Sequence, residues 1–191
     1  MRRLAVSLGA LLVCAAPYAC GGRTAHTVTI PINHRATPTA CTPQAISTVG
    51  CSDTSGAPAC TSSSECTAGL DGSCDLFGVC TCTYDACLSD GDCGSDTSSA
   101  CDCDAAPGGA GSTGSPMRCV AANCRVDSDC GPAGYCSPSV SGGCGTVAGV
   151  FCHTTDDECG NDSDCAAPTN ACMYLPELGH WACGFRSGCG G

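Results

Sequence analysis

Hydrophobic residues are sparse along most of the chain and do not recur at helical spacing. After an apolar stretch at residues 4–16, no window places apolar residues repeatedly three and four positions apart, so long helices are not expected. Residues 26–32 alternate between polar and β-branched side chains, which favours a short strand there. The pattern therefore predicts short strands, turns and single helical turns.

The amino-acid composition indicates that disulfide bridges take the place of a conventional hydrophobic core. Leucine, isoleucine, valine and phenylalanine make up only 19 of the 172 residues from Cys20 onward, whereas cysteine accounts for 24 of all 191 residues. Disulfide bridges stabilise small exported proteins by about 2–4 kcal/mol each and persist in oxidising compartments. We predict a small disulfide-rich fold of tandem cysteine-stapled repeats with little regular secondary structure.

The N-terminus resembles an export signal. Arg2 and Arg3 precede the apolar stretch at residues 4–16, and small residues follow it. Thirteen apolar residues are fewer than the roughly 20 needed to span a bilayer. We therefore assign residues 1–19 to a signal peptide and expect an exported protein, either secreted or held at the outer membrane and cell surface.

The end of this signal resembles the lipobox of bacterial lipoproteins. A small residue, Ala19, precedes Cys20, the candidate lipidation site and mature N-terminus. Pro17 occupies the place where leucine is usual, so ordinary signal-peptidase cleavage nearby is the alternative. Either route leaves 22 cysteines, an even number that allows up to 11 disulfides.

The cysteines repeat as a unit of five whose second and third members are always separated by five residues. Four copies are present: Cys51, Cys60, Cys66, Cys74 and Cys80; Cys82, Cys87, Cys93, Cys101 and Cys103; Cys119, Cys124, Cys130, Cys136 and Cys144; and Cys152, Cys159, Cys165, Cys172 and Cys183. An acidic residue precedes the third cysteine in every copy. Because five is odd, at least one bridge per unit must leave it, so we expect units stapled to one another.

The remaining segments give the domain organisation. Residues 20–50 form a polar, proline-punctuated tether, residues 51–103 hold repeats 1 and 2, and residues 119–191 hold repeats 3 and 4. Between them, residues 104–118 are rich in glycine, serine and proline. That composition is typical of a flexible loop or hinge.

The carboxylates inside the fixed gap are candidate calcium ligands. Asp127 and Asp129 lie in the third repeat, and Asp162 and Asp164 in the fourth. Calcium prefers such oxygen ligands, but a complete calcium loop ending in glutamate at its twelfth position is absent. The favoured interpretation is that these side chains accept hydrogen bonds from nearby backbone N–H groups and cap a turn.

Other metal and catalytic chemistry finds little support. The chain has no Cys-x-x-Cys pair, the familiar form of zinc and thioredoxin-type sites. Its four histidines do not fall in a recognised catalytic motif. We therefore expect no enzyme activity and no cofactor.

Apolar side chains gather near the C-terminus. Tyr174, Leu178, Trp181 and Phe185 form a candidate contact patch for an unidentified protein or cell-envelope partner. The favoured alternative makes them the small core of the last repeat.

The negative net charge of the chain excludes some classes of binding partner. Lysine is absent, which suits a high-GC bacterial source, and removal of residues 1–19 leaves five arginines against 18 acidic residues. Such an acidic surface repels nucleic-acid phosphates and anionic lipid headgroups. We expect no nucleic-acid binding, and membrane contact only through a lipid on Cys20.

Residues Cys124 to Cys136, CRVDSDCGPAGYC, resemble cysteine-rich repeats of secreted and lipoprotein-like myxobacterial proteins. More loosely, the pattern is similar to Dickkopf-type and whey acidic protein domains, although it lacks the adjacent Cys-Cys pair of the latter. The resemblance implies an exported repeat architecture and no particular activity. Three functions follow as expectations: a structural or interaction protein at the cell surface first, then a secreted protease inhibitor, then a calcium-binding surface module.

Overall fold

The computed structural model describes residues 30–38, 40–42, 59–76, 80–103, 116–140, 146–166 and 170–185. The predicted signal peptide and Cys20 lie outside these residues. The regular elements are short strands and 3-10 turns: η1 (Ser63–Glu65), β1 (Leu70–Leu76), β2 (Cys80–Asp85), η2 (Asp90–Cys93), β3 (Ser99–Asp102), β4 (Arg118–Ala122), η3 (Asp127–Cys130), β5 (Tyr135–Val140), β6 (Val147–His153), η5 (Asp162–Asp164), β7 (Asn170–Leu175) and β8 (His180–Phe185). The prediction of a small disulfide-rich fold with little regular structure is confirmed.

Disulfides divide the described array into four equivalent modules. Each module is a Cys-x5-Cys loop followed by a β-hairpin, and we number them 1 to 4 for residues 60–82, 87–119, 124–152 and 159–183. The first loop cysteine bridges to the first hairpin strand, and the second loop cysteine to the second strand. The eight bridges are Cys60–Cys74, Cys66–Cys82, Cys87–Cys101, Cys93–Cys119, Cys124–Cys136, Cys130–Cys152, Cys159–Cys172 and Cys165–Cys183.

The strand register explains why two bridges serve one loop. In module 3, Cys136 and Cys152 lie directly opposite each other on β5 and β6, and the cysteines of the other three hairpins do the same. The opposed cysteines are not bonded to each other, since both reach back to the same loop. Each loop is consequently fastened at both ends to its own hairpin.

The expected links between five-cysteine units are present. Cys66–Cys82, Cys93–Cys119 and Cys130–Cys152 each join one five-cysteine unit to the next. In the folded structure, however, the first cysteine of the second, third and fourth units lies on the second hairpin strand of the preceding module. The bridges therefore group the cysteines in fours, shifted by one position from the repeat in the sequence.

The hydrophobic interior is divided among the modules. The described residues form four separate buried clusters, and cysteines contribute to every one of them. The largest, in module 3 and its junction with module 2, adds Ala100, Val120, Val147 and Val150. Cross-links thus stand where a single aliphatic core would otherwise be required.

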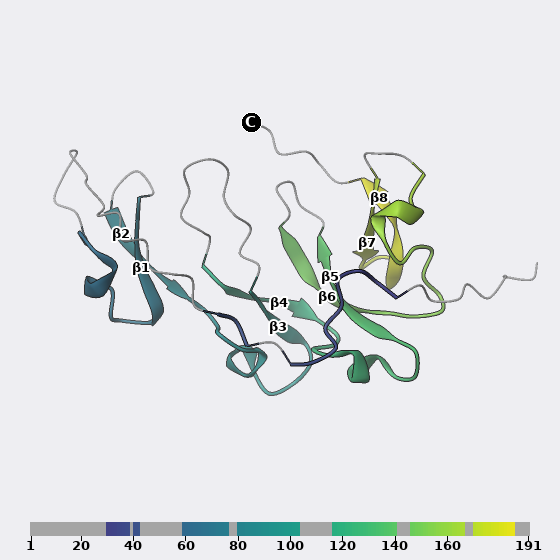
Figure 1. Cartoon of the computed structure of the whole chain (residues 1–191), viewed down its shortest axis with the longest axis horizontal. Coiled ribbons are helices and arrows are strands. Elements are labelled where there is room, and N and C mark those ends of the chain that lie inside the picture. The colour runs from purple at the N-terminus through teal and green to yellow at the C-terminus, as the bar shows by residue number, and fades with distance from the viewer. Residues whose placement is uncertain are drawn as a thin grey trace, which may run out of the picture.

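The modules are arranged as an elongated row, with the β1–β2 hairpin at one end and β7–β8 at the other (Figure 1). Modules 2 and 3 share a four-stranded sheet of order β3-β4-β6-β5. Their junction is the parallel pair β4–β6, in which Ala121 faces Gly149 and Ala122 faces Val150. A Cβ at position 149 would lie 2.5 Å from the Ala121 carbonyl oxygen, so glycine permits this close approach.

The N-terminal segment, residues 30–38 and 40–42, runs back along the row. Its purple trace passes from the neighbourhood of β5 and β6 to that of β3 and β4 (Figure 1). Residues 30–32, the described part of the strand expected at 26–32, are not in a strand, so the expectation is wrong there. The segment is held by side chains and single backbone bonds from several modules, which gives it no continuous strand partner.

Candidate functional site

The third residue of each Cys-x5-Cys loop caps the first strand of its hairpin. Asp127 Oδ1 accepts the backbone N–H of Cys136 at 2.8 Å. The equivalent bonds run from Cys74 to Ser63 Oγ, from Cys101 to Asp90 Oδ1 and from Cys172 to Asp162 Oδ1. An outward-facing N–H of an edge strand would otherwise be open to pairing with another chain.

The fifth residue of each loop caps the start of the loop itself. Asp129 Oδ2 accepts the backbone N–H groups of Arg125 and Val126 at 2.8 and 3.1 Å. Asp92 and Asp164 each accept two backbone N–H groups in the same way, and Glu65 accepts that of Thr61. Serine or aspartate at the third position and an acid at the fifth therefore have structural roles.

These hydrogen bonds change the acidity of the exposed caps. Bonds from the Leu88 backbone, then from Ser89, hold the pKa of Asp92 below its ordinary value of 3.8. Thr61 lowers the pKa of Glu65 for the same reason. Burial has the opposite effect on Asp85, whose pKa is raised by desolvation. Asp92 and Glu65 are thus carboxylates whose charged form the fold favours.

The candidate calcium ligands Asp127, Asp129, Asp162 and Asp164 all belong to this capping system. Asp129 and Asp164 have the backbone partners that the turn-capping interpretation predicts. Asp127 and Asp162 instead accept the N–H groups of the strand residues Cys136 and Cys172, which that interpretation did not predict. Within the described ranges, groups of three or more potential ligand atoms lying within 4.8 Å of one another consist of cysteines alone. Every cysteine in those groups is bridged. The carboxylates are therefore not brought together around a common point.

The N-terminal segment joins the loops of three successive modules. Ile32 N–H bonds Asn161 Oδ1 in module 4, and Asp127 of module 3 donates its N–H to the Arg35 carbonyl. In module 2, Cys41 N–H bonds the Leu88 carbonyl. This arrangement was not predicted from the sequence. The only signal for it was Cys41 itself, which stands outside the repeats and therefore needs a distant partner.

Arg35 is the deepest charged contact of this segment. Its side chain is 12% exposed, and Nη1 lies 3.1 Å from Asp90 Oδ1, on a carboxylate that is itself buried. Nη2 donates to the Cys101 carbonyl at 2.6 Å, while the Arg35 backbone N–H bonds the Cys136 carbonyl. One arginine thereby connects modules 2 and 3.

A groove lies between the N-terminal segment and the four-stranded sheet. Its volume is about 410 Å³, and its walls include His34 and Arg35 on one side and Asp102, Val140 and Val150 on the other. The segment forms one wall, so its attachment decides whether the groove exists. The same lining mixes charged and apolar side chains.

The candidate contact patch is divided between core and surface. Trp181 is 3% exposed and stacks on His153, with ring centroids 3.9 Å apart, while Tyr174 is half-buried and stacks on Phe151. Leu178 and Phe185 are exposed, at 51% and 68%. Trp181 and Tyr174 therefore fill the junction of modules 3 and 4, as the small-core alternative describes, and Leu178 and Phe185 remain at the surface. This alternative was the favoured interpretation.

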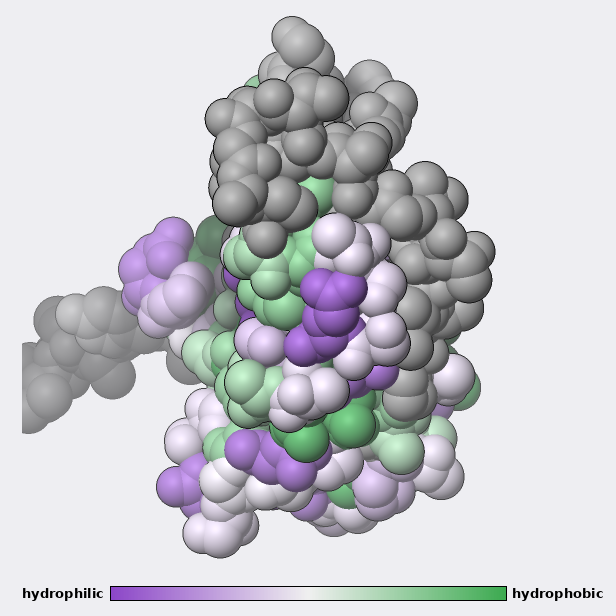
Figure 2. All heavy atoms as spheres, turned by 90° about the vertical axis from the view of Figure 1, so that its left-hand side faces the viewer, coloured by the Kyte–Doolittle hydropathy of each residue, from purple (hydrophilic) through white to green (hydrophobic). Residues whose placement is uncertain are grey.

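At the opposite end, the surface offers no broad apolar area among the described residues in view. Figure 2 shows this end, where hydrophilic and hydrophobic residues alternate in small areas. Among the described residues, no helix is both long and apolar enough for a membrane span.

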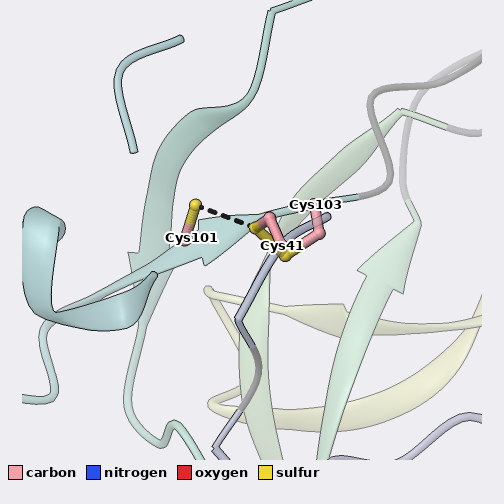
Figure 3. Close-up of side chains that lie close together, drawn as sticks. All are labelled: Cys41, Cys101 and Cys103. Atoms are coloured by element: carbon pink, nitrogen blue, oxygen red, sulfur yellow. Dashed lines mark hydrogen bonds between the residues drawn. A yellow bond between two sulfur atoms is a disulfide. The ribbon is translucent and has the colours of Figure 1, made fainter. Parts of the chain in front are cut away.

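A cluster of sulfur atoms anchors the N-terminal segment to module 2. Cys41 is bridged to Cys103, which follows β3 directly, and Cys101 is bridged to Cys87. Figure 3 shows Cys41 Sγ facing Cys101 Sγ, and the two atoms are 3.4 Å apart. Since both sulfurs are bridged, neither carries a hydrogen, and the contact is one between two disulfides. The spacing of the cysteines does not predict this proximity.

Comparison with protein-family models, curated proteins and solved structures finds no match for this chain. Its function is therefore inferred from its own residues and their arrangement.

Proposed function

We propose that the protein is an exported, surface-anchored structural or interaction protein without catalytic activity. The proposal rests on the N-terminal segment, which joins modules 2, 3 and 4 in one row. It does so through Cys41–Cys103, the contacts of Arg35, and the hydrogen bond from Ile32 to Asn161. A row braced in this way keeps the spacing between its ends without a large core. Such a braced, cross-linked row suits a protein exposed to proteases outside the cell.

The direction of the segment supports anchoring at a defined end. Its first described residues, Ile30 to Ile32, lie at module 4, where Ile32 bonds Asn161. A lipid on Cys20 would hold the chain ten residues before Ile30. The module 4 end would then face the membrane, and modules 2 and 1 would extend away from it.

Protease inhibition has less support from the loop geometry. An inhibitory loop presents a side chain outward to the protease, whereas here the third and fifth side chains of each loop bind their own backbone. A calcium-binding role is weakened by the same use of the carboxylates. Binding through the exposed Leu178 and Phe185 fits the interaction role better.

The test is expression with the native N-terminus in a bacterial host that exports and lipidates proteins, followed by fractionation and non-reducing mass spectrometry. We expect a membrane-associated form with a lipid on Cys20 and no free thiols. Cys20→Ser should release the protein from the membrane without changing its bridges. Recovery of cytoplasmic protein with many free thiols would contradict the proposal.

Two further assays separate the alternatives on the same oxidised sample. Stoichiometric inhibition of a secreted protease would favour the inhibitor role, and calcium-dependent heat in a titration would favour the calcium module. We expect neither, and we expect pull-down partners to be lost from a Leu178→Ser/Phe185→Ser variant while Glu177→Ser, at an exposed position in the same turn, retains them.

A further inference from the structure

Two disulfides touch where the N-terminal segment meets module 2. Cys41 Sγ and Cys101 Sγ are 3.4 Å apart, and the sulfurs of Cys41, Cys101 and Cys103 all lie within 4.8 Å of one another (Figure 3). Cys101 also lies in a second such group with Cys87 and Cys93. The Cys87–Cys101 bridge thus has sulfur neighbours on both sides.

The four cysteines of the two touching disulfides differ in their exposure to solvent. Cys87 and Cys101 are fully buried and Cys41 is 7% exposed, whereas Cys103 is only partly buried. Thiol–disulfide exchange begins when a thiolate reaches a disulfide sulfur and forms a mixed disulfide. Of the four, Cys103 is the residue that an external thiol reaches most readily.

We infer that the Cys41–Cys103 bridge is a thiol-exchange site that passes the exchange to the buried Cys87–Cys101 bridge. Its reaction partner is a thiol, either a small molecule or the cysteine of a thiol oxidoreductase. This inference does not depend on the proposed surface role, because it concerns chemistry within the folded array.

The exchange balances without an added oxidant. An external thiolate attacks Cys103 Sγ, forming a mixed disulfide and releasing the Cys41 thiolate. The Cys41 thiolate attacks Cys101 Sγ, forming Cys41–Cys101 and releasing the Cys87 thiolate. The Cys87 thiolate then attacks Cys103 Sγ in the mixed disulfide, forming Cys87–Cys103 and returning the external thiolate.

The exchange changes which cysteine near β3 holds the N-terminal segment. Cys41 begins bridged to Cys103, is a thiolate after the first step, and ends bridged to Cys101 on β3. The loop of module 2 loses its Cys87–Cys101 bridge in the second step, retains Cys93–Cys119 throughout, and is bridged again through Cys87–Cys103 in the last step. The cluster therefore permits the bridges of module 2 to rearrange, with the N-terminal segment bridged again at the end.

The first experiment exposes the oxidised full-length protein to reduced glutathione at pH 8, with samples quenched in acid, alkylated and mapped by mass spectrometry. We expect glutathione on Cys103 before it appears on Cys41, Cys87 or Cys101, and then a Cys41–Cys101 link at about tenfold or more above any link between cysteines that are not in contact, because a positioned thiolate attacks intramolecularly. Glutathione on Cys87 or Cys101 before Cys103, or a Cys41–Cys101 link no more abundant than distant links, would overturn the inference.

A matched pair of variants tests the relay itself. Cys103→Ser leaves Cys41 as a thiol, and alkylation should then divide between Cys41 and Cys87. The double variant Cys41→Ser/Cys103→Ser lacks the attacking thiol and should show no label on Cys87. Label confined to Cys41 in the single variant, or label on Cys87 in the double variant, would each rule out the relay. If Cys103→Ser does not fold, the glutathione experiment decides alone.

Discussion

Asp127 binds His34 and its own module at the same time. Its Oδ2 lies 2.7 Å from His34 Nδ1, while its Oδ1 accepts the Cys136 N–H at 2.8 Å. The equivalent residues of modules 2 and 4, Asp90 and Asp162, cap their strands likewise. Asp127 therefore caps its hairpin, as its equivalents do, and also contacts the N-terminal segment, which we call the brace (residues 30–38 and 40–42).

Asp127→Ala should weaken module 3 more than substitution of an exposed residue in the same loop. It leaves the N–H of Cys136 without an acceptor, at a cost of about 1–3 kcal/mol, and removes the contact to His34. We expect amide exchange at Cys136 to accelerate about tenfold or more, as measured by NMR.

Two variants bracket this effect. Asp127→Asn keeps an acceptor for Cys136 but not the negative charge opposite His34, so it should be milder. Ser128→Ala changes an exposed loop residue and should leave the exchange unchanged. Equal acceleration by Ser128→Ala would show that the loop, rather than the cap, sets the exchange rate.

Acid should act in opposite senses on two carboxylates of modules 1 and 2. The bonds from Leu88 and Ser89 lower the pKa of Asp92, so its stabilising charge is fully present above the unfolded-state value and is lost as pH falls through its lower folded value. Desolvation raises the pKa of Asp85, so protonation of Asp85 becomes favourable at higher pH than in the unfolded chain.

A carboxyl NMR titration from about pH 6 down to pH 2 measures both groups in one sample. We expect a midpoint below 3.8 for Asp92 and above 3.8 for Asp85. The amide shifts of Leu88 and Ser89 should follow the Asp92 titration. Coincident midpoints for the two carboxyl groups would contradict the capping account.

The sequence was sufficient to predict the class of fold because its evidence is local. The low aliphatic content and the fixed five-residue gap at Cys124 to Cys130 predict stapled loops, and the odd cysteine count predicts links between units. The acid before each closing cysteine likewise indicates a capped turn. Each inference depends on residues that lie close together in the chain.

The brace and the sulfur cluster depend on contacts between distant residues. Cys41 pairs with Cys103 across 62 positions, and His34 meets Asp127 across 93. Nothing in the local sequence distinguishes these partners from other cysteines and acids. The burial of Trp181 could not be predicted for the same reason. It depends on stacking against the His153 ring, which lies 28 positions away in the sequence.

Gly149→Ala should loosen the junction between modules 2 and 3. The added methyl group would lie 2.5 Å from both the Ala121 carbonyl oxygen and the Phe151 ring, which forces the parallel strands apart at a cost of about 1–3 kcal/mol. Exchange of the Asn123 amide, which bonds the Val150 carbonyl across this junction, should accelerate accordingly.

The control for Gly149→Ala is Gly91→Ala. A Cβ at position 91 would meet only Ser89 Oγ, at an ordinary 3.5 Å, so stability should change by about 0.5 kcal/mol or less. Similar losses in both variants would show that the close β4–β6 approach is not the reason for glycine at position 149.

Arg35→Ala should detach the brace without breaking its covalent anchor. The change leaves the buried Asp90 carboxylate without its guanidinium partner, and Asp90 Oδ2 has no hydrogen-bond partner among the described residues. Removing one member of a buried pair costs about 3–5 kcal/mol. Limited proteolysis should therefore cut within residues 30–38 and release the fragment that precedes the cut, while the residues from the cut to Cys41 stay attached through Cys41–Cys103.

Arg118→Ala is the matched control, because the exposed Arg118 contacts Asp102 at 3.7 Å and the Val147 carbonyl at 2.9 Å rather than the N-terminal segment. A brace that resists cleavage in Arg35→Ala, or that is cut equally in Arg118→Ala, would show that Cys41–Cys103 and the backbone contacts suffice to hold it.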